Sequence, residues 1–229
     1  DIMISAFWEM FKPLYAVDTL EGYTENEIAY LKELFGALPQ VLEDYYRAAG
    51  RTKAFHCVQD TWILPEHFQK WEWLWEPEYL ILLNENQGVC RAGIRREDLM
   101  LPDPPVYVTE DDKNWTLCAP TTSEFLSAAL AYECVFTFEC NPEEFYWLTE
   151  EELGLIQSKL TKLPFEITNW LCGMRITLYS NEPDNMVAVM DCGDWELHGD
   201  GELQMLYGAA SEASYASLMS VLEGVGEAI

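Results

Sequence analysis

The sequence predicts an α+β fold, in which mostly antiparallel strands pack with helices that cover one face of each sheet. Three observations support this class: apolar residues at helical spacing follow capping residues, short apolar runs end at turns, and the two kinds of segment alternate along the chain. With 229 residues, 49% of them hydrophobic and 14% aromatic, the chain is too apolar to be a disordered acidic segment. It should bury a proper core.

The first helices are predicted from apolar spacing and caps. Aromatic residues at helical spacing over residues 7–15 predict a short amphipathic helix that a proline interrupts. Thr24 and Glu27 have the spacing of a capping box and open a clearer helix over residues 24–38. A Leu-Pro step ends that helix, and a second one is expected over residues 39–50.

Strands follow in the first half. Residues 79–83 form an apolar run that turns at a glycine into residues 89–94, as a hairpin would. Residues 104–108 are expected to be an edge strand because their prolines cannot donate to a ladder. A short strand over residues 115–118 precedes a helix that starts near Thr122.

The second half repeats this order of elements. Residues 149–164 match residues 24–39 at a constant offset of 125, including the capping threonine and the final Leu-Pro. Either the chain contains a degenerate duplication, or capped amphipathic helices resemble one another by physics alone. The expected domains are residues 1–139 and a carboxy-terminal α+β half, residues 140–229. The further elements predicted in that half are strands at 175–179 and 186–190, a hairpin from 195–197 to 202–206, and a helix over 215–225.

The net charge of the chain restricts the class of molecule that it can bind. The chain has 40 acidic and 13 basic residues, for a formal net charge of −27, and no lysine or arginine follows Arg175. Such a field repels nucleic acid and anionic lipid and attracts cationic partners. A basic protein is therefore the expected partner, and the alternative is that the acidity serves solubility alone.

Composition also predicts the compartment. No stretch is apolar and long enough to span a membrane, and the amino terminus lacks the basic region of a signal peptide. Seven cysteines, with no C-x-x-C clamp, indicate reduced thiols in the core. The expected location is the cytoplasm.

Acidic clusters and tryptophans are the candidate partner-binding residues. Three tryptophans alternate as on one face of a strand, which suits either a core edge or an interface hot spot. Acidic residues form a dense loop in the first half and gather near a predicted hairpin in the second. The candidates are Glu110, Asp111, Asp112, Asp191, Asp194, Asp200, Trp71, Trp73 and Trp75.

Catalytic chemistry has little support. His198 and Asp200, with Asp191 and Asp194, have the residue types of a metal site, but the glycines around Asp200 also suit a tight turn. The three acids at 150–152 suit the first turn of a helix. The sequence lacks a phosphate-binding glycine loop, a Gly-x-Ser-x-Gly elbow and a His-Glu-x-x-His motif. We therefore expect a non-enzymatic protein without a cofactor.

A series of short motifs follows in order along residues 20–135: Thr24, Glu25, Glu27, Ile28, Leu38, Pro39, Tyr45, Tyr46, Gly50, Tyr79–Leu83, Gln87, Gly88, Pro105–Tyr107 and Thr122–Leu126. This series resembles the SUKH superfamily, which includes fungal regulators of cell-wall synthesis and bacterial immunity proteins. The resemblance implies an α+β fold and the binding of a cognate toxin, often a nuclease, whose active site is blocked; it implies no catalytic residues. The long segment 51–78 and the extra residues 140–229 depart from the single-domain pattern.

These observations together predict a cytoplasmic immunity protein that neutralises a basic, nuclease-type toxin by occluding its active site. An adaptor that binds cell-wall or signalling proteins is the alternative within the same class. A metal-dependent hydrolase around Asp191, Asp194, His198 and Asp200 is the alternative from another class.

Overall fold

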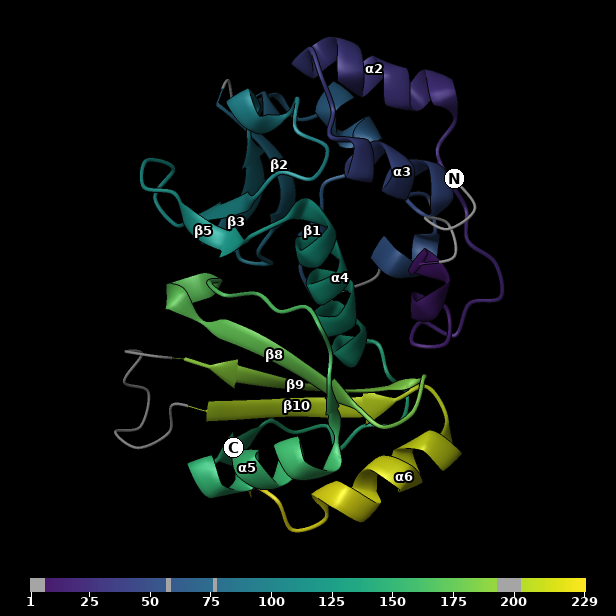
Figure 1. Ribbon diagram of the computed structural model, residues 1–229, viewed down its shortest axis with the longest axis vertical. Helices are drawn as coiled ribbons and strands as arrows, with labels where there is room; N and C mark the ends of the chain where they lie inside the picture. The colour runs from purple at the N-terminus through teal and green to yellow at the C-terminus, as the bar shows by residue number, and fades with distance from the viewer. Residues whose placement is uncertain (1–6, 57–58, 76–77, 193–202) are drawn as a thin grey trace.

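Two antiparallel sheets lie on either side of a central helix, and further helices pack against them (Figure 1). The structure is a computed structural model, and it describes residues 7–56, 59–75, 78–192 and 203–229. Every strand pair among these residues is antiparallel, which confirms the α+β class.

The first sheet has the order β1-β2-β3-β4-β5. The predicted edge position of residues 104–108 is wrong, because β4 pairs with both β3 and β5. Its prolines precede the first paired residue, Val106, so the ladder loses no donor. The strands are β1 (Thr61–Trp62), β2 (Tyr79–Asn84), β3 (Arg91–Arg95), β4 (Val106–Thr109) and β5 (Thr116–Ala119).

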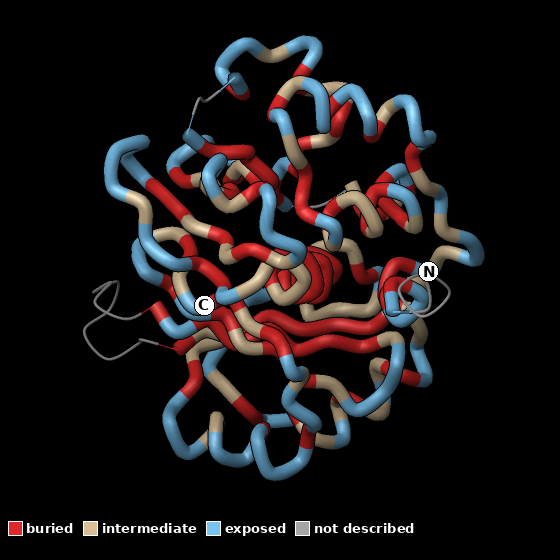
Figure 2. Tube along the Cα trace, turned by 45° about the horizontal axis from the view of Figure 1, so that its top comes forward, coloured by how far each residue is buried: buried red, intermediate tan, exposed pale blue. Residues whose placement is uncertain are grey.

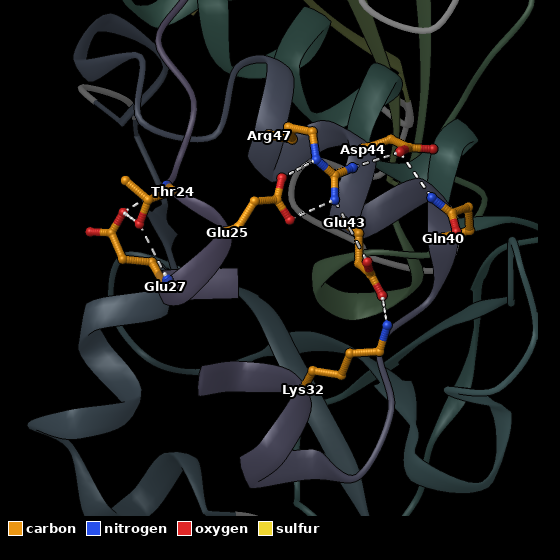
Figure 3. Close-up of polar contacts among 8 residues, drawn as sticks. All are labelled: Thr24, Glu25, Glu27, Lys32, Gln40, Glu43, Asp44 and Arg47. Carbon is orange, nitrogen blue, oxygen red and sulfur yellow. Dashed lines mark hydrogen bonds and ion pairs between the residues drawn. The ribbon is translucent and has the colours of Figure 1, made fainter. Parts of the chain in front are cut away.

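Helices α2 (Glu25–Phe35) and α3 (Gln40–Ala48) pack together beside this sheet. The capping box of Thr24 and Glu27 is confirmed, with both reciprocal hydrogen bonds formed (Figure 3). Gly36, at φ 81°, ends α2 earlier than the predicted Leu-Pro step, because glycine enters the left-handed region freely. The predicted helix over residues 7–15 is shorter than expected, and Glu9–Phe11 is a 3-10 turn.

Further 3-10 turns join these elements. They are η2 (Lys53–His56), η3 (Pro65–Gln69), η4 (Glu72–Leu74), η5 (Arg96–Asp98), η6 (Cys134–Phe136) and η7 (Leu171–Gly173).

Helix α4 (Thr122–Glu133) is the centre of the molecule. It contacts β5 on one side and β8 and β9 on the other, and ten of its 12 residues are buried (Figure 2). Alanines at positions 128, 129 and 131 are fully buried and let both sheets approach the helix closely. One hydrophobic core therefore extends across both predicted domains.

The second sheet has the order β11-β6-β10-β9-β8-β7. The predicted strands at 175–179 and 186–190 are confirmed, whereas β6, β7 and β11 were not anticipated. The helix expected over 149–164 ends at Lys159, and β7 takes residues from its expected last turn. The predicted hairpin turn at 199–201 lies outside the described residues. The strands are β6 (Tyr146–Leu148), β7 (Thr161–Lys162), β8 (Arg175–Ser180), β9 (Asn185–Asp191), β10 (Leu203–Ala209) and β11 (Glu227–Ala228).

Both faces of this second sheet are covered, so the prediction of helices on one face only is wrong here. In β9, Met186, Ala188 and Met190 belong to the core around α4. The intervening Val187 and Val189 face a second core beneath α5 (Glu150–Lys159) and α6 (Glu212–Leu222). A strand buried on both faces has a continuous apolar run instead of an alternating one, as this strand does.

The two halves share an order of elements. A capped helix, a four-strand meander and a second helix occur as α2, β2-β3-β4-β5 and α4, and again as α5, β7-β8-β9-β10 and α6. In each half an aspartate side chain accepts a hydrogen bond from a serine where the second helix begins, Asp103 from Ser123 and Asp184 from Ser211. The Leu-Pro steps differ, because Pro39 leads into a helix and Leu163 follows β7. The duplication stays a prediction.

Candidate functional site

The three tryptophans of the candidate site do not share a strand. Two single-turn helices, η3 and η4, occupy this segment instead, so the predicted alternation on one face is wrong. Pro65 takes the first position of η3, where its fixed φ suits a helical turn. Trp71 and Trp73 nevertheless stack on each other, whereas Trp75 has a different partner.

Trp71 and Trp73 take part in a stack that begins at His67. The ring centroids of His67 and Trp71 are 4.0 Å apart, and those of Trp71 and Trp73 are 6.2 Å apart at an interplanar angle of 16°. The guanidinium of Arg91, on β3, lies 5.3 Å from the Trp73 centroid. We call these four residues the Trp–Arg stack. Trp73 remains 44% exposed.

Trp75 stands apart from this stack. It is 54% exposed, and its indole Nε1 donates a hydrogen bond to the carbonyl oxygen of Phe68 at 2.7 Å. It resembles Trp73 in size and exposure and differs in its contacts, which makes it a natural control for Trp73.

The acidic loop, residues 110–112, joins β4 to β5 next to the Trp–Arg stack. Arg91 Nε donates to the Asp112 carboxylate at 2.7 Å while its guanidinium lies over Trp73. Arg91 thus connects the predicted aromatic and acidic candidates into one surface, although 39 residues of sequence separate Trp73 from Asp112. Its position in β3, opposite Thr109 of β4, makes this possible.

Asp111 has a structural role in that loop. Its carboxylate accepts hydrogen bonds from the backbone N–H groups of Asn114 and Lys113, at 2.7 and 2.9 Å. These bonds hold the pKa of Asp111 well below its usual range, so the group stays ionised. Asp112, at φ 62°, follows in the left-handed conformation that the turn requires.

Glu110 connects the acidic loop to the second sheet. Its carboxylate accepts the backbone N–H of Cys172 at 2.8 Å, in the turn before β8. Cys172 has φ 53°, a conformation that non-glycine residues rarely adopt. Asp191 lies across the sheet from Arg175, at the end of β9, and this end lies on the same side of the molecule as the acidic loop (Figure 1). Asp194, His198 and Asp200 lie outside the described residues.

The outer face of the first sheet extends this surface with residues that the sequence analysis missed. The rings of Tyr79 and Trp115 stack with centroids 3.6 Å apart, and the Arg95 guanidinium lies 4.4 Å from the Tyr107 centroid. The spacing of Arg91 and Arg95 could have identified this surface from the sequence. These two arginines lie on one face of a strand, in a chain with only 13 lysines and arginines.

Helices α2 and α3 are joined by ion pairs between basic and acidic side chains (Figure 3). Arg47 of α3 donates to Glu25 of α2, and Lys32 of α2 pairs with Glu43 of α3 at 2.7 Å. Because these cations are engaged within the chain, they are not a free basic surface.

Among residues 7–56, 59–75, 78–192 and 203–229, no three His, Cys, Asp or Glu residues are arranged to hold a metal ion. His56 contacts the Gly50 carbonyl oxygen at 2.8 Å, and burial lowers its pKa. Cys57, the next residue in the sequence, lies outside the described residues. Of residues 150–152, Glu152 completes the capping box of α5.

No helix in the described part of the chain has the length and apolarity needed to cross a membrane. Comparison of the chain with models of protein families, with curated proteins and with solved structures finds no match.

Proposed function

We propose that this chain is a SUKH-like immunity protein, without enzymatic activity, that neutralises a basic, nuclease-type toxin by occluding its active site. The observation that carries the proposal is the double contact of Arg91 with Trp73 and Asp112, which joins an aromatic anchor to an acidic loop. We further propose that the protein acts in the cytoplasm.

The composition of this surface supports binding to a protein. Tryptophan, tyrosine and arginine dominate the energetics of protein interfaces, because they bury large areas and still form polar contacts. Trp73 is 44% exposed and Leu117, on β5, is 46% exposed, so apolar area is available for a partner to cover. The Trp–Arg stack holds Trp73 in place, which lowers the entropy lost on binding.

The charge of the surroundings supports a basic partner. Arg91 is paired with Asp112, whereas Asp111 is held ionised by backbone N–H groups. A net charge of −27 steers a cationic partner toward the chain. The same charge repels nucleic acid, with which the chain would compete for the toxin. In the proposed complex the acidic loop lies over the basic cleft of the toxin and takes the place of substrate phosphates.

The test compares two tryptophans that differ in their contacts. The chain is co-expressed with the product of each reading frame that neighbours its own, and the pair that associates is purified. Trp73→Ala should then weaken binding and nuclease inhibition at least about tenfold, as hot-spot truncations do. Trp75→Ala is the matched control and should change affinity by less than about threefold, because it lies outside the Trp–Arg stack.

Two results would refute the proposal. If Trp75→Ala weakens inhibition as much as Trp73→Ala, the Trp–Arg stack is not the contact. If a bound partner retains full nuclease activity, binding does not occlude the active site.

A further inference from the structure

A cluster of buried acids lies at the carboxy-terminal end of α4. Glu133, the last residue of α4, is fully buried, and Asp60 is only 5% exposed. The Asp60 backbone N–H donates to Glu133 Oε2 at 3.1 Å, while Glu133 Oε1 has no hydrogen-bond partner.

The turn between β2 and β3 closes over this pair. The Asn86 backbone N–H donates to Asp60 Oδ1 at 3.1 Å. Glu85, which is 8% exposed, accepts the backbone N–H groups of Gln87 and Val89 at 2.8 and 3.3 Å. Three segments far apart in sequence therefore meet at the two carboxyl groups.

Among the described residues, the ionisable groups that face the pair bring no positive charge. Glu85 and Cys90 come from the β2–β3 turn, Tyr15 comes from the amino-terminal segment, and Tyr132 and Cys134 adjoin Glu133 in the chain. Each of these groups is either neutral or negative. Two carboxylates buried side by side without a cation would repel each other and lose their hydration.

We propose that Asp60 and Glu133 share one proton in the folded protein, and that this proton holds the segment before β1 and the β2–β3 turn against the end of α4. A protonated carboxyl group can donate an O–H to a neighbouring carboxylate, so one shared proton removes the repulsion between the two groups and can supply the partner that Glu133 Oε1 lacks. Aspartic acid pairs in other proteins share a proton for the same reason.

The pKa values of both carboxyl groups shift in the direction that a shared proton requires. Burial, followed by the charge of Asp60, raises the pKa of Glu133 to about 10. Burial also raises the pKa of Asp60. An unfolded chain exposes both groups to water, so unfolding near neutral pH releases the proton.

Glu133→Gln tests the proposal, because glutamine preserves the shape of the side chain and can donate an N–H to Asp60 without a titrating proton. Calorimetric unfolding at neutral pH in buffers of different ionisation enthalpy counts the protons released. We expect the variant to release about one proton fewer than the parent chain. Equal proton release in the two proteins would overturn the proposal.

A second measurement needs no variant. The infrared spectrum of the parent chain in heavy water, near neutral pD, should contain the carbonyl stretch of a protonated carboxylic acid. If that band is absent, both groups are ionised and the proposal is wrong. Glu133→Gln should lose the band, because its amide N–H takes the place of the shared proton; a band that persists unchanged in this variant would also contradict the proposal.

Discussion

Replacing Arg91 with methionine tests whether this residue joins the aromatic and acidic surfaces. The variant keeps an apolar stem and removes the guanidinium. A cation–π contact at an exposed site contributes about 0.5–1 kcal/mol, and an exposed ion pair about 0.2–1 kcal/mol. The side chains of Arg91 and Asp112 are 20% and 56% exposed, so solvent screens the ion pair. The contribution of the ion pair to stability therefore lies at the low end of its range. We expect a total loss of about 1 kcal/mol in the free energy of unfolding.

A double-mutant cycle isolates the ion pair. Urea unfolding, followed by circular dichroism, is measured for Arg91→Met, Asp112→Asn and the double variant. The expected coupling energy between the two sites is about 0.5 kcal/mol. Arg95→Met is the matched control, because Arg95 lies on the same strand, stacks over Tyr107 and pairs with Glu97. Its coupling to Asp112 should be zero. If the losses in the free energy of unfolding simply add for the Arg91 and Asp112 substitutions, the two side chains are not coupled and the proposed link between the aromatic and acidic surfaces is refuted.

Three further predictions concern stability. Thr24→Ala removes the N-cap of α2 and should lower the free energy of unfolding by about 1 kcal/mol in urea titrations, and an unchanged midpoint would show that the cap is dispensable. Gly208→Ala should be more destabilising in the same titration, because an added Cβ would lie 2.7 Å from the Cys140 carbonyl oxygen; a neutral result would contradict this close approach. His67 accepts the Leu64 N–H on Nδ1, and burial lowers its pKa, so the stability that depends on the neutral ring should decline as pH falls below the ordinary value of 6.5. His67→Gln should remove that part of the pH dependence, and identical pH profiles of the two proteins would exclude the effect.

Local chemistry made much of the fold predictable. The capping boxes of α2 and α5 were identified from a threonine and a glutamate three residues apart, and both formed as expected. The strands β2 and β9 were identified from apolar runs that end at turns. These signals depend on residues close in sequence, so tertiary contacts rarely override them.

The rest depends on contacts between distant residues. Tryptophans at every second position are typical of a strand, yet this segment forms the short helical turns η3 and η4. The prolines near β4 indicated an edge strand, although their exact placement before Val106 allows pairing on both sides. Of the candidate site, the acidic loop and Trp73 were identified, whereas Arg91 was missed because its role appears only when β3 and β4 pair.

The central claim is that an acidic surface centred on the Trp–Arg stack binds a basic partner. The most direct measurement is the rate of association with the cognate toxin domain by stopped flow, as ionic strength increases from about 20 to 500 mM. The account predicts at least about a tenfold decrease in the association rate, with a much smaller change in dissociation, because exposed charges act chiefly on encounter. An association rate that barely changes with salt would contradict it, and would mean that the acidity of the chain does not guide binding.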